Sequence, residues 1–398
     1  MNDPQRLNQL VRDAAAAIAL SEPQRAIDLI AEVERARVRH PDVAHLKGNA
    51  FLALKDPARA LMAYDAALVM EPYHLPSILG KGAALDELGC KTDAAAVWRN
   101  ALKVAPSAER LAPPLAELHA RARKRVDEDN KELRDYLIEG VQSVRTAYGA
   151  SELKRFDESL EIFAGRTRAF HPEPTMLHFP ALPPVSFFDR AHFPWFEILE
   201  SASGIIVEEL KTILATPTAD DFAPYIAYPP GSPVNQWGEL NRSRRWSSYF
   251  FFNNGARQPE AWRNAPRTAA LLETLPILKV DAFGPTAMFS SLAPKTRIPP
   301  HTGSTNVRAI VHLPLILPGP AWFRVGNDKR EWRMGEAWAF DDTIEHEAMN
   351  EAGETRVILI CDTWNPYLTE PERELVAALL QAKSAYQRQS GGQADRFS

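Results

Sequence analysis

The chain holds only two cysteines among its 398 residues, Cys90 and Cys361. Thiols so few and so far apart predict neither a disulfide framework nor a cysteine-based metal site, and they fit a reducing compartment. No stretch approaches the ~20 consecutive apolar residues of a membrane helix. The first residues scatter acidic and basic side chains and lack the apolar core of a signal peptide. We therefore expect a cytoplasmic protein with no membrane partner.

An excess of either charge is also missing. The net charge is −5 and the sequence pI is about 6.1, which gives no electrostatic basis for binding nucleic acid or an acidic membrane. Hydrophobic residues make up 45% and charged residues 24% of the chain, as in ordinary soluble proteins. Because 398 residues exceed the usual size of one domain, we expect an α+β protein of several domains.

The first third of the chain repeats with a period of 34 residues. Small residues, an aromatic residue and a proline recur at that spacing, in the pairs Gly48/Gly82, Ala60/Ala94, Tyr64/Trp98, Ala67/Ala101 and Pro72/Pro106. The pattern resembles the tetratricopeptide repeat (TPR), a pair of antiparallel helices with a period of about 34 residues. Such repeats stack into a surface that binds a partner protein or peptide. The alternative is a structural or dimerising appendage.

An imperfect earlier copy precedes these two. Ala16, Ala26 and Ile30 each stand 34 residues before a position of the next copy, whereas the proline that should close the copy is Pro41, three residues late. Three copies are about the minimum for a stable stack. We therefore expect TPR-like repeats over residues 1–125.

The following segment keeps a helical pattern but becomes highly charged, as in the run ARKRVDEDNKELRD. Because both signs alternate, this run predicts a solvated helix face with intrahelical ion pairs rather than a basic surface for nucleic acid. We expect a charged helical connector over residues 126–169 that caps the repeats.

Prolines, aromatic residues and short β-forming runs dominate beyond Phe170. The segment HPEPTMLHFPALPP predicts an extended strap over a β-core, and helices are expected near residues 197–215 and 268–273. Short β-forming runs follow at RWSSYFFFNNG, TAMFSSLAP, VRAIVHLPLIL, AWFRVG, GEAWAFDD and RVILICDTW. This spacing predicts a double-stranded β-helix, the jelly-roll or cupin-like barrel, over residues 170–388. The end of this region, from 370, reads as an amphipathic helix, and residues 389–398 as a disordered tail.

Two histidines each lie just before or after one of these runs, His301 in IPPHTG and His346 in TIEHEA. Imidazole suits iron, zinc, copper and nickel, so the residues alone leave the metal open. A non-haem iron site usually has a carboxylate two residues after its first histidine, but that position is Gly303. Glu345 and Glu347 flank His346 and would point away from it on an extended chain. The residues thus predict a two-histidine metal site with no evident third ligand.

Arg356 begins a run that is otherwise apolar. A cation among apolar side chains is costly unless it meets an anion, and the arginine fork suits a carboxylate. The arrangement would serve a 2-oxo-diacid that chelates the metal and places its distal carboxylate on the arginine. The alternative is a structural ion pair with Asp341 or Asp342. Strand alternation also places Arg308 and His312 on one face of VRAIVHL.

Taken together, PHTGSTNVR with HLPL, then FDDTIEHE, then VILICDTWNP resemble the aspartyl/asparaginyl β-hydroxylase family of iron- and 2-oxoglutarate-dependent dioxygenases. The resemblance covers about residues 172–372, and that family lacks the usual carboxylate, as Gly303 does here. It implies that His301 and His346 bind Fe(II) and that Arg356 binds the distal carboxylate of 2-oxoglutarate. The further co-substrate contacts that it implies are Ser290, His312 and Trp246, although Trp246 could simply belong to the core.

One position departs from the family pattern. The family has R-x-R-x-H where this chain has R-A-I-V-H, so Ile310 replaces an arginine that helps to hold the metal-proximal carboxylate of 2-oxoglutarate. Arg308 lies on the same strand face and is a candidate replacement. The departure implies weaker 2-oxoglutarate binding, an altered pose or a relaxed choice of co-substrate.

The resulting prediction is a dioxygenase that uses Fe(II), 2-oxoglutarate and O2 to hydroxylate the β-carbon of aspartyl or asparaginyl residues. Its substrate would be a protein or peptide that the repeats present. One alternative is hydroxylation of a free or carrier-bound amino acid or another small acyl substrate. Another is a non-catalytic repeat adaptor with a degenerate barrel, for which Ile310 is the support.

Overall fold

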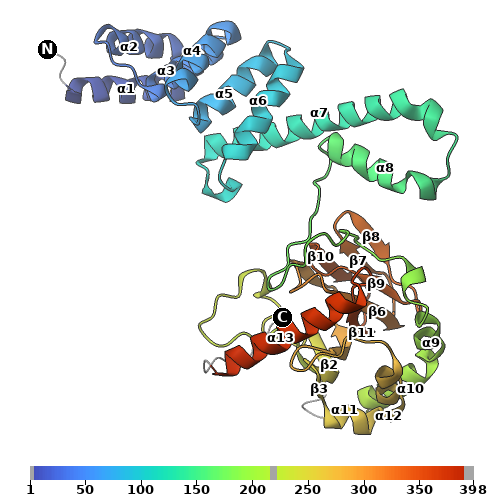
Figure 1. The fold of residues 1–398 in the computed structure, drawn as a ribbon. Helices are drawn as coiled ribbons and strands as arrows, with labels where there is room; N and C mark the ends of the chain where they lie inside the picture. Colours follow the sequence, from blue (N-terminus) through green and yellow to red (C-terminus); the bar gives the residue numbers. More distant parts are fainter. Residues whose placement is uncertain (1–3, 216–221, 390–398) are drawn as a thin grey trace. The chain divides into compact units, whose positions relative to one another are not determined.

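A computed structural model describes residues 4–215 and 222–389, and the chain divides into two compact units, Met1–Arg168 and Ala169–Ser398. The first unit is built of helices, and the second combines β-sheets with helices (Figure 1). Across the described ranges, no helix is long and apolar enough to cross a membrane. The tail predicted for 389–398 lies, beyond Gln389, outside the described residues.

The first unit opens with helices that pair in sequence as hairpins. Their bounds are α1 (Pro4–Ala19), α2 (Pro23–Arg35), α3 (Pro41–Ala53), α4 (Pro57–Met70), α5 (Leu75–Glu87) and α6 (Lys91–Val104). Each hairpin turns through a residue with positive φ, at Ser21, Lys55 and Gly89, which are 34 residues apart. The predicted period therefore appears in the backbone itself, and these helical repeats resemble TPRs.

The small and aromatic residues of the repeat meet between the helices of each hairpin. A Cβ atom at Gly48 would lie 2.5 Å from Tyr64, and one at Gly82 would lie 2.6 Å from Trp98. Both aromatic side chains are fully buried. The glycines are therefore required by the close approach of the ring, which is the physical reason for the repeated pair.

The earliest copy differs from the sequence prediction in two respects. Ala26 and Ile30 are buried as expected, but Ala16 is exposed and Ala14 and Ala17 take the buried positions of α1. Pro41 does not close the second helix, because α2 ends at Arg35 and Pro41 is the first residue of α3. Proline suits that position, where the helix has no use for its backbone N–H.

A long helix follows the hairpins after the short turn η1 (Ala108–Arg110). Helix α7 (Pro113–Arg145) packs on α5 and α6 at its start and on α8 (Ala150–Phe163) further along. It runs without a break through residues 125 and 126, where the repeats were expected to give way to the connector. Asp86 pairs with Arg121 and Arg125, which ties α7 to the last hairpin.

The second unit contains two antiparallel sheets. The seven-stranded major sheet has the order β1-β2-β4-β11-β6-β9, with β3 paired to β2, and the minor sheet has the order β5-β10-β7-β8. The major strands are β1 (Ala223–Pro224), β2 (Trp246–Asn253), β3 (Ala256–Arg257), β4 (Ala287–Leu292), β6 (Arg308–Ile316), β9 (Trp338–Phe340) and β11 (Arg356–Trp364). The minor strands are β5 (Thr296–His301), β7 (Ala321–Val325), β8 (Asp328–Glu331) and β10 (His346–Asn350).

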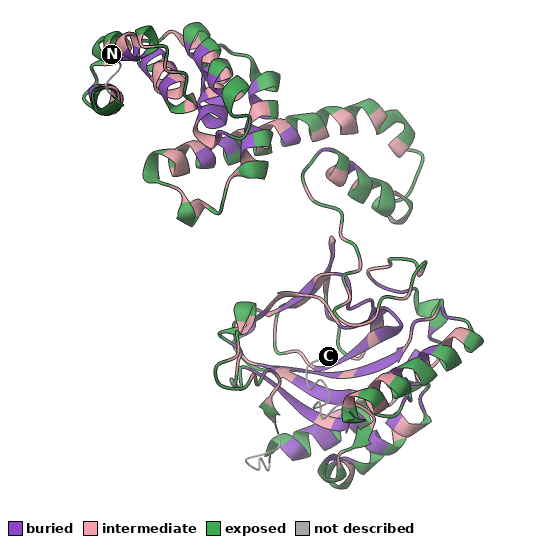
Figure 2. Ribbon diagram, turned by 60° about the vertical axis from the view of Figure 1, so that its left-hand side comes forward, coloured by how far each residue is buried: buried purple, intermediate pink, exposed green. Residues whose placement is uncertain are grey.

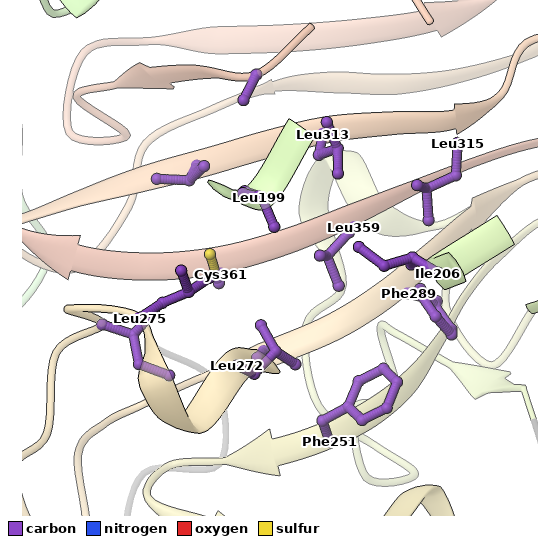
Figure 3. Packing of buried hydrophobic residues seen from close by; sticks show 14 of the residues in the cluster. Leu199, Ile206, Phe251, Leu272, Leu275, Phe289, Leu313, Leu315, Leu359 and Cys361 are labelled. Carbon is purple, nitrogen blue, oxygen red and sulfur yellow. The ribbon is translucent and has the colours of Figure 1, made fainter. Parts of the chain in front are cut away.

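Strand alternation sends the two faces of the major sheet to different cores. One face packs against helices through a cluster that includes Leu313, Leu359 and Phe289 (Figure 3). The helices of this unit are α9 (Phe196–Ser201), α10 (Ser203–Ala215), α11 (Pro259–Asn264), α12 (Pro266–Thr274) and α13 (Glu370–Gln389), with the short turns η2 (Arg190–His192) and η3 (Asn235–Trp237). The other face meets the minor sheet through a second apolar cluster. Figure 2 shows these strands mostly buried and the helices exposed on their outer sides.

The strap expected at the start of the second unit is present. It is extended and joins the core through isolated bridges, Pro172 to Ile344, Leu177 to Thr305 and Phe187 to Phe340. The helix expected over 197–215 is interrupted, because α9 ends at Ser201 and α10 begins at Ser203. The helix expected over 268–273 is confirmed within α12.

The β-runs named from the sequence all form strands, but the two strands that carry the histidines, β5 and β10, were not among them. Strand β5 (TRIPPH) contains Pro299 and Pro300, which argue against a central strand. The minor sheet resolves this, because β5 lies at its edge, where prolines are tolerated.

The contact between Gly82 and Trp98 gives a stability prediction. Gly82→Ala should lower the free energy of unfolding of the first unit by about 1–3 kcal/mol, as overpacking does in a filled core. Gly140→Ala is the matched control, because a Cβ at that helical position meets nothing within 4 Å, and it should stabilise by up to about 1 kcal/mol. Urea unfolding followed by far-ultraviolet circular dichroism measures both. Equal effects of the two substitutions would contradict the packing argument.

Candidate functional site

His301 and His346 lie side by side on neighbouring strands of the minor sheet. His301 ends β5, His346 begins β10, and the register pairs the two residues directly. Their ring centroids are 4.0 Å apart. The Nδ1 of His301 lies 2.8 Å from the carbonyl oxygen of Pro299, and the Nδ1 of His346 lies 3.0 Å from that of Ile344. If each Nδ1–H donates to its carbonyl, both Nε2 atoms keep a free lone pair.

The environment also keeps both imidazoles neutral. Desolvation, together with the neighbouring His346, lowers the pKa of His301 to about 3. Desolvation likewise lowers the pKa of His346 to about 4. Neutral imidazole is the form that binds a metal, so at pH 7 both rings have the protonation state of ligands.

Gly303 lies against the carboxylate of Asp342. A Cβ atom at Gly303 would overlap that carboxylate, so no residue with a side chain fits at position 303 while Asp342 keeps its place. The Oδ1 of Asp342 is buried and has no hydrogen-bond partner among the described residues. In the described ranges no three His, Cys, Asp or Glu side chains converge as a complete metal cluster. The structure, like the sequence, therefore indicates two histidine ligands for a metal and assigns no third one.

The two glutamates beside His346 are turned away from the histidines, as expected for an extended chain. Glu347 is bound by Arg297 and, at 2.6 Å, by Arg324. Arg324 also lies 2.9 Å from Glu345. This ion-pair network belongs to the outer side of the minor sheet and leaves the histidine side free of carboxylates from β10.

Arg356 is buried in the major sheet with only 1% of its surface exposed. Its Nη1 donates a hydrogen bond to the carbonyl oxygen of Ser290 at 3.4 Å. Its guanidinium carbon lies 4.8 Å from the centre of the Trp332 ring. Its Nε has no hydrogen-bond partner among the described residues. Burial lowers the pKa of Arg356 to about 9, which still leaves a cation at neutral pH. The structure shows no ion pair of Arg356 with Asp341 or Asp342 in the described chain. A buried cation in this state is costly unless an anion meets it, and the guanidinium fork suits a carboxylate.

The other residues expected around a co-substrate gather near Arg356. Trp246 is buried, and its Nε1 donates to the Oγ of Ser290 at 3.2 Å. Trp246 and Arg356 are both in register with Leu292, on either side of β4. His312 lies on the same face of β6 as Arg308, and its Nδ1 is buried without a partner among the described residues. Trp246, Ser290 and His312 were expected beside Arg356 from the sequence, and the fold brings these residues together.

Arg308 takes a different place. Its Nη2 lies 3.3 Å from Asp342 and its Nη1 lies 3.7 Å from Asp362, and all three side chains are buried. The arginine is thus held by two carboxylates rather than free. Burial raises the pKa of Asp362 to about 7, although Arg308 opposes that rise. Sequence analysis missed Asp362, which a same-face count along β11 from Arg356 (356, 358, 360, 362) could have found.

These groups line one cavity of about 900 Å³ between the two sheets. His301 and His346 face it from the minor sheet, and Arg356 and Arg308 face it from the major sheet. The remaining wall combines polar side chains, among them Tyr225, Asn235, Gln236, Asn253 and Thr302, with aromatic and aliphatic ones. Its apolar members on the major sheet include Trp246, Phe250, Met288, Ile310, Ile358 and Ile360.

Part of the second unit matches a known protein family. Residues 203–366 match the family model of aspartyl/asparaginyl β-hydroxylases. The human aspartyl/asparaginyl β-hydroxylase is 36% identical over 141 residues, which are 35% of this chain and 18% of that protein. The chain thus spans about a fifth of the length of that human protein and of its mouse counterpart.

Other relatives match more of their own length. An ornithine lipid ester-linked acyl 2-hydroxylase from Rhizobium tropici is 32% identical over 205 residues, 50% of this chain and 66% of that protein. Human aspartate β-hydroxylase domain-containing protein 2 is 29% identical and covers 62% of this chain and 65% of its own. Among solved structures, the first TPR domain of human RPAP3 is 16% identical with a TM-score of 0.28, covering 32% of this chain and 96% of that one. Over residues 203–366, the second unit of this chain is thus similar to the aspartyl/asparaginyl β-hydroxylase family.

Proposed function

We propose that the second unit is an Fe(II)- and 2-oxoglutarate-dependent hydroxylase. The observation that carries the proposal is the pairing, in one cavity, of two neutral histidines with a buried arginine that has no carboxylate partner among the described residues. The first group suits a divalent transition metal and the second suits a dicarboxylate. We assign the two sheets to the double-stranded β-helix, in which facing sheets enclose such a site.

The residues present fit the metal. His301 and His346 would hold it through their Nε2 atoms, because each Nδ1 faces a backbone carbonyl. Iron bound there supplies the activation of O2 and the oxidation of a C–H bond. Asp342 remains next to the histidine pair, where its Oδ1 can accept a hydrogen bond. The two carbonyls fix the ring orientation before any metal arrives.

Arg356 would bind the distal carboxylate of 2-oxoglutarate. Ser290 and Trp246 hold each other in place beside it, and His312 contributes a second buried polar atom. Ile310 stands where the family has its second arginine, so the cavity wall lacks that arginine. Because Arg308 is engaged by Asp342 and Asp362, we assign no co-substrate contact to Arg308.

Two classes of substrate follow from the relatives. The family description favours the β-carbon of an aspartyl or asparaginyl residue in a protein or peptide, which the TPR-like repeats would present. The acyl 2-hydroxylase from Rhizobium tropici favours an acyl substrate. Aliphatic side chains in the cavity wall, among them Ile310, Ile358 and Ile360, support the second class and are the reason for keeping it. The reducing, cytoplasmic setting expected from the sequence suits an Fe(II) enzyme.

The metal assignment is tested by removing one imidazole. His301→Ala and His346→Ala should each weaken Co(II) binding by at least about 10-fold, since a ligand is lost from a two-histidine site. Titration of Co(II), followed by its visible absorption, measures the affinity. His178→Ala, at an exposed histidine of the strap, is the control and should bind as wild type does. Unchanged Co(II) binding by both variants would contradict the assignment of His301 and His346 as metal ligands.

Substitution by leucine should affect a different property at each of the two buried arginines: ligand binding at Arg356 and folding stability at Arg308. Arg356→Leu should cost about 2–5 kcal/mol of 2-oxoglutarate binding, at least about 30-fold in Kd. It should not destabilise the ligand-free protein, because it removes an unpaired buried charge. Arg308→Leu should instead lower the free energy of unfolding by about 3–5 kcal/mol, since two buried carboxylates lose their counter-ion.

Isothermal titration with 2-oxoglutarate in the presence of Zn(II), and thermal unfolding without ligand, measure the two effects. Zn(II) holds the metal position without allowing turnover. Wild-type affinity in Arg356→Leu would overturn the assignment of the dicarboxylate to this residue.

A further inference from the structure

Trp237 lies against one of the two histidines and has no task in the hydroxylase function proposed above. It ends η3, in the loop that joins β1 to β2. Its ring centroid lies 5.0 Å from that of His301, with the two ring planes at 67°. Trp246 is the other described indole in contact with His301, and its ring centroid is farther away, at 6.4 Å. Trp237, Trp246 and both histidines line the same cavity.

Hydrogen bonds within the loop hold Trp237 on His301. The carbonyl oxygen of Trp237 accepts hydrogen bonds from the backbone N–H groups of Leu240, at 2.9 Å, and Asn241, at 2.7 Å. The side-chain oxygen of Asn241 in turn accepts a hydrogen bond from the N–H of Tyr228 at 2.9 Å, which closes the loop. Leu240 is buried in an apolar cluster against which Trp237 packs. The contact between Trp237 and His301 is therefore part of the fixed architecture of the cavity.

Among the rings beside the histidine pair, the indole of Trp237 combines closeness with easy oxidation. Phe323 and Phe340 lie 5.7 and 5.4 Å from the ring centroid of His346, but a benzene ring is less electron-rich than an indole and reacts more slowly with an oxidant. Trp246 is also an indole, but it is the more distant of the two and is buried, whereas Trp237 is partly exposed. We therefore expect Trp237 to react first with an oxidant produced at the histidines.

The proposed reaction produces an oxidant that needs an acceptor. A substrate that fills the site accepts the oxygen atom and protects the surrounding protein from side reactions. Without substrate, the acceptor has to be a side chain that lines the cavity. The geometry around His301 then makes the ring of Trp237 the first candidate.

We propose, on the basis of the hydroxylase function above, that Trp237 is a self-hydroxylation site, whose indole ring accepts the oxygen atom when the cavity holds no substrate. The balance is Trp237 C–H + O2 + 2-oxoglutarate → Trp237 C–OH + succinate + CO2. One oxygen atom enters an indole C–H bond and the other enters the new carboxylate of succinate. The C–H bond and the 2-oxo acid each give two electrons to O2. A bound substrate takes the same oxygen atom, so it should suppress the modification.

Mass spectrometry of the full-length chain tests the proposal. The protein is incubated with Fe(II), 2-oxoglutarate and air, without substrate, and is then digested with trypsin. Trp237 is the single tryptophan of the tryptic peptide 212–242, whereas Trp246 falls in peptide 246–257 and Met288 in peptide 280–295. Peptide 212–242 should gain one oxygen atom on Trp237, and the other two peptides should gain less. When the O2 is enriched in a heavy oxygen isotope, the added atom should be heavy.

Controls separate self-hydroxylation from adventitious oxidation. Omission of 2-oxoglutarate, replacement of Fe(II) by Zn(II), and the variant His301→Ala should each abolish the gain of oxygen. Trp237→Phe should remove it from peptide 212–242 and keep the 2-oxoglutarate affinity of wild type, because phenylalanine still packs a ring on His301. Trp322→Phe is the matched control. Trp322 is not among the described residues that line the cavity, and its Nε1 donates to Glu351, so this variant should be modified on Trp237 as wild type is.

A second measurement needs no turnover. Co(II) quenches the fluorescence of nearby indoles, so Co(II) bound at His301 and His346 should quench the fluorescence of Trp237. Trp237→Phe should therefore lose a larger part of the Co(II)-induced quenching than Trp322→Phe does.

Failure of the hydroxylase function and failure of the self-hydroxylation site give different results. If wild type does not bind 2-oxoglutarate, the proposed hydroxylase function is wrong. If wild type binds 2-oxoglutarate but Trp237 gains no oxygen, or the oxygen enters Trp246 or Met288 instead, only the assignment of Trp237 is overturned. Equal oxidation of Trp237 without 2-oxoglutarate, or equal quenching in the two phenylalanine variants, would overturn it as well.

Discussion

The side chain of Arg356 lies inside the second unit with no carboxylate beside it among the described residues, and the rest of the site depends on that unmet charge. The sheet provides the carbonyl of Ser290 and the face of Trp332, which reduce the cost of burial but do not remove it. Buried groups with perturbed pKa values of this kind cluster at functional sites. The strand register places Arg356 in one row with Leu292 and Trp246. An anion bound to Arg356 would therefore share the cavity with the histidine pair.

Arg308 shows what the same side chain does when the chain itself supplies the anions. Asp342, in the turn after β9, and Asp362, on β11, hold it from two sides, and it becomes part of the scaffold. Ile310 belongs to this arrangement, because it lies opposite Asp362 in the register. An arginine at 310 would stand next to Asp362 and compete for that carboxylate. With isoleucine at residue 310, Asp342 and Asp362 are both left to pair with Arg308.

Much of this organisation could be predicted from periodicity. The 34-residue repeat anticipated the close contact of Gly82 with Trp98, and alternation along β6 anticipated that Arg308 and His312 share a face. Strands β5 and β10 were missed because their sequences hold prolines and charged residues. Those residues are tolerated for reasons that lie far away in sequence: β5 is a sheet edge, and Glu347 meets Arg297 and Arg324. Residues 203–366 alone match the family model, so the repeats had to be identified from their own spacing.

Gly303 links the metal side of the cavity to its charged side. From the sequence it is a missing ligand; in the structure it is the space into which the carboxylate of Asp342 fits. From that position Asp342 pairs with Arg308, and Arg308 in turn meets Asp362. A carboxylate at residue 303 would therefore do more than add a ligand, since it would displace Asp342 and leave Arg308 with a single counter-ion. The absence of a side chain at residue 303 and the paired state of Arg308 then have the same structural cause.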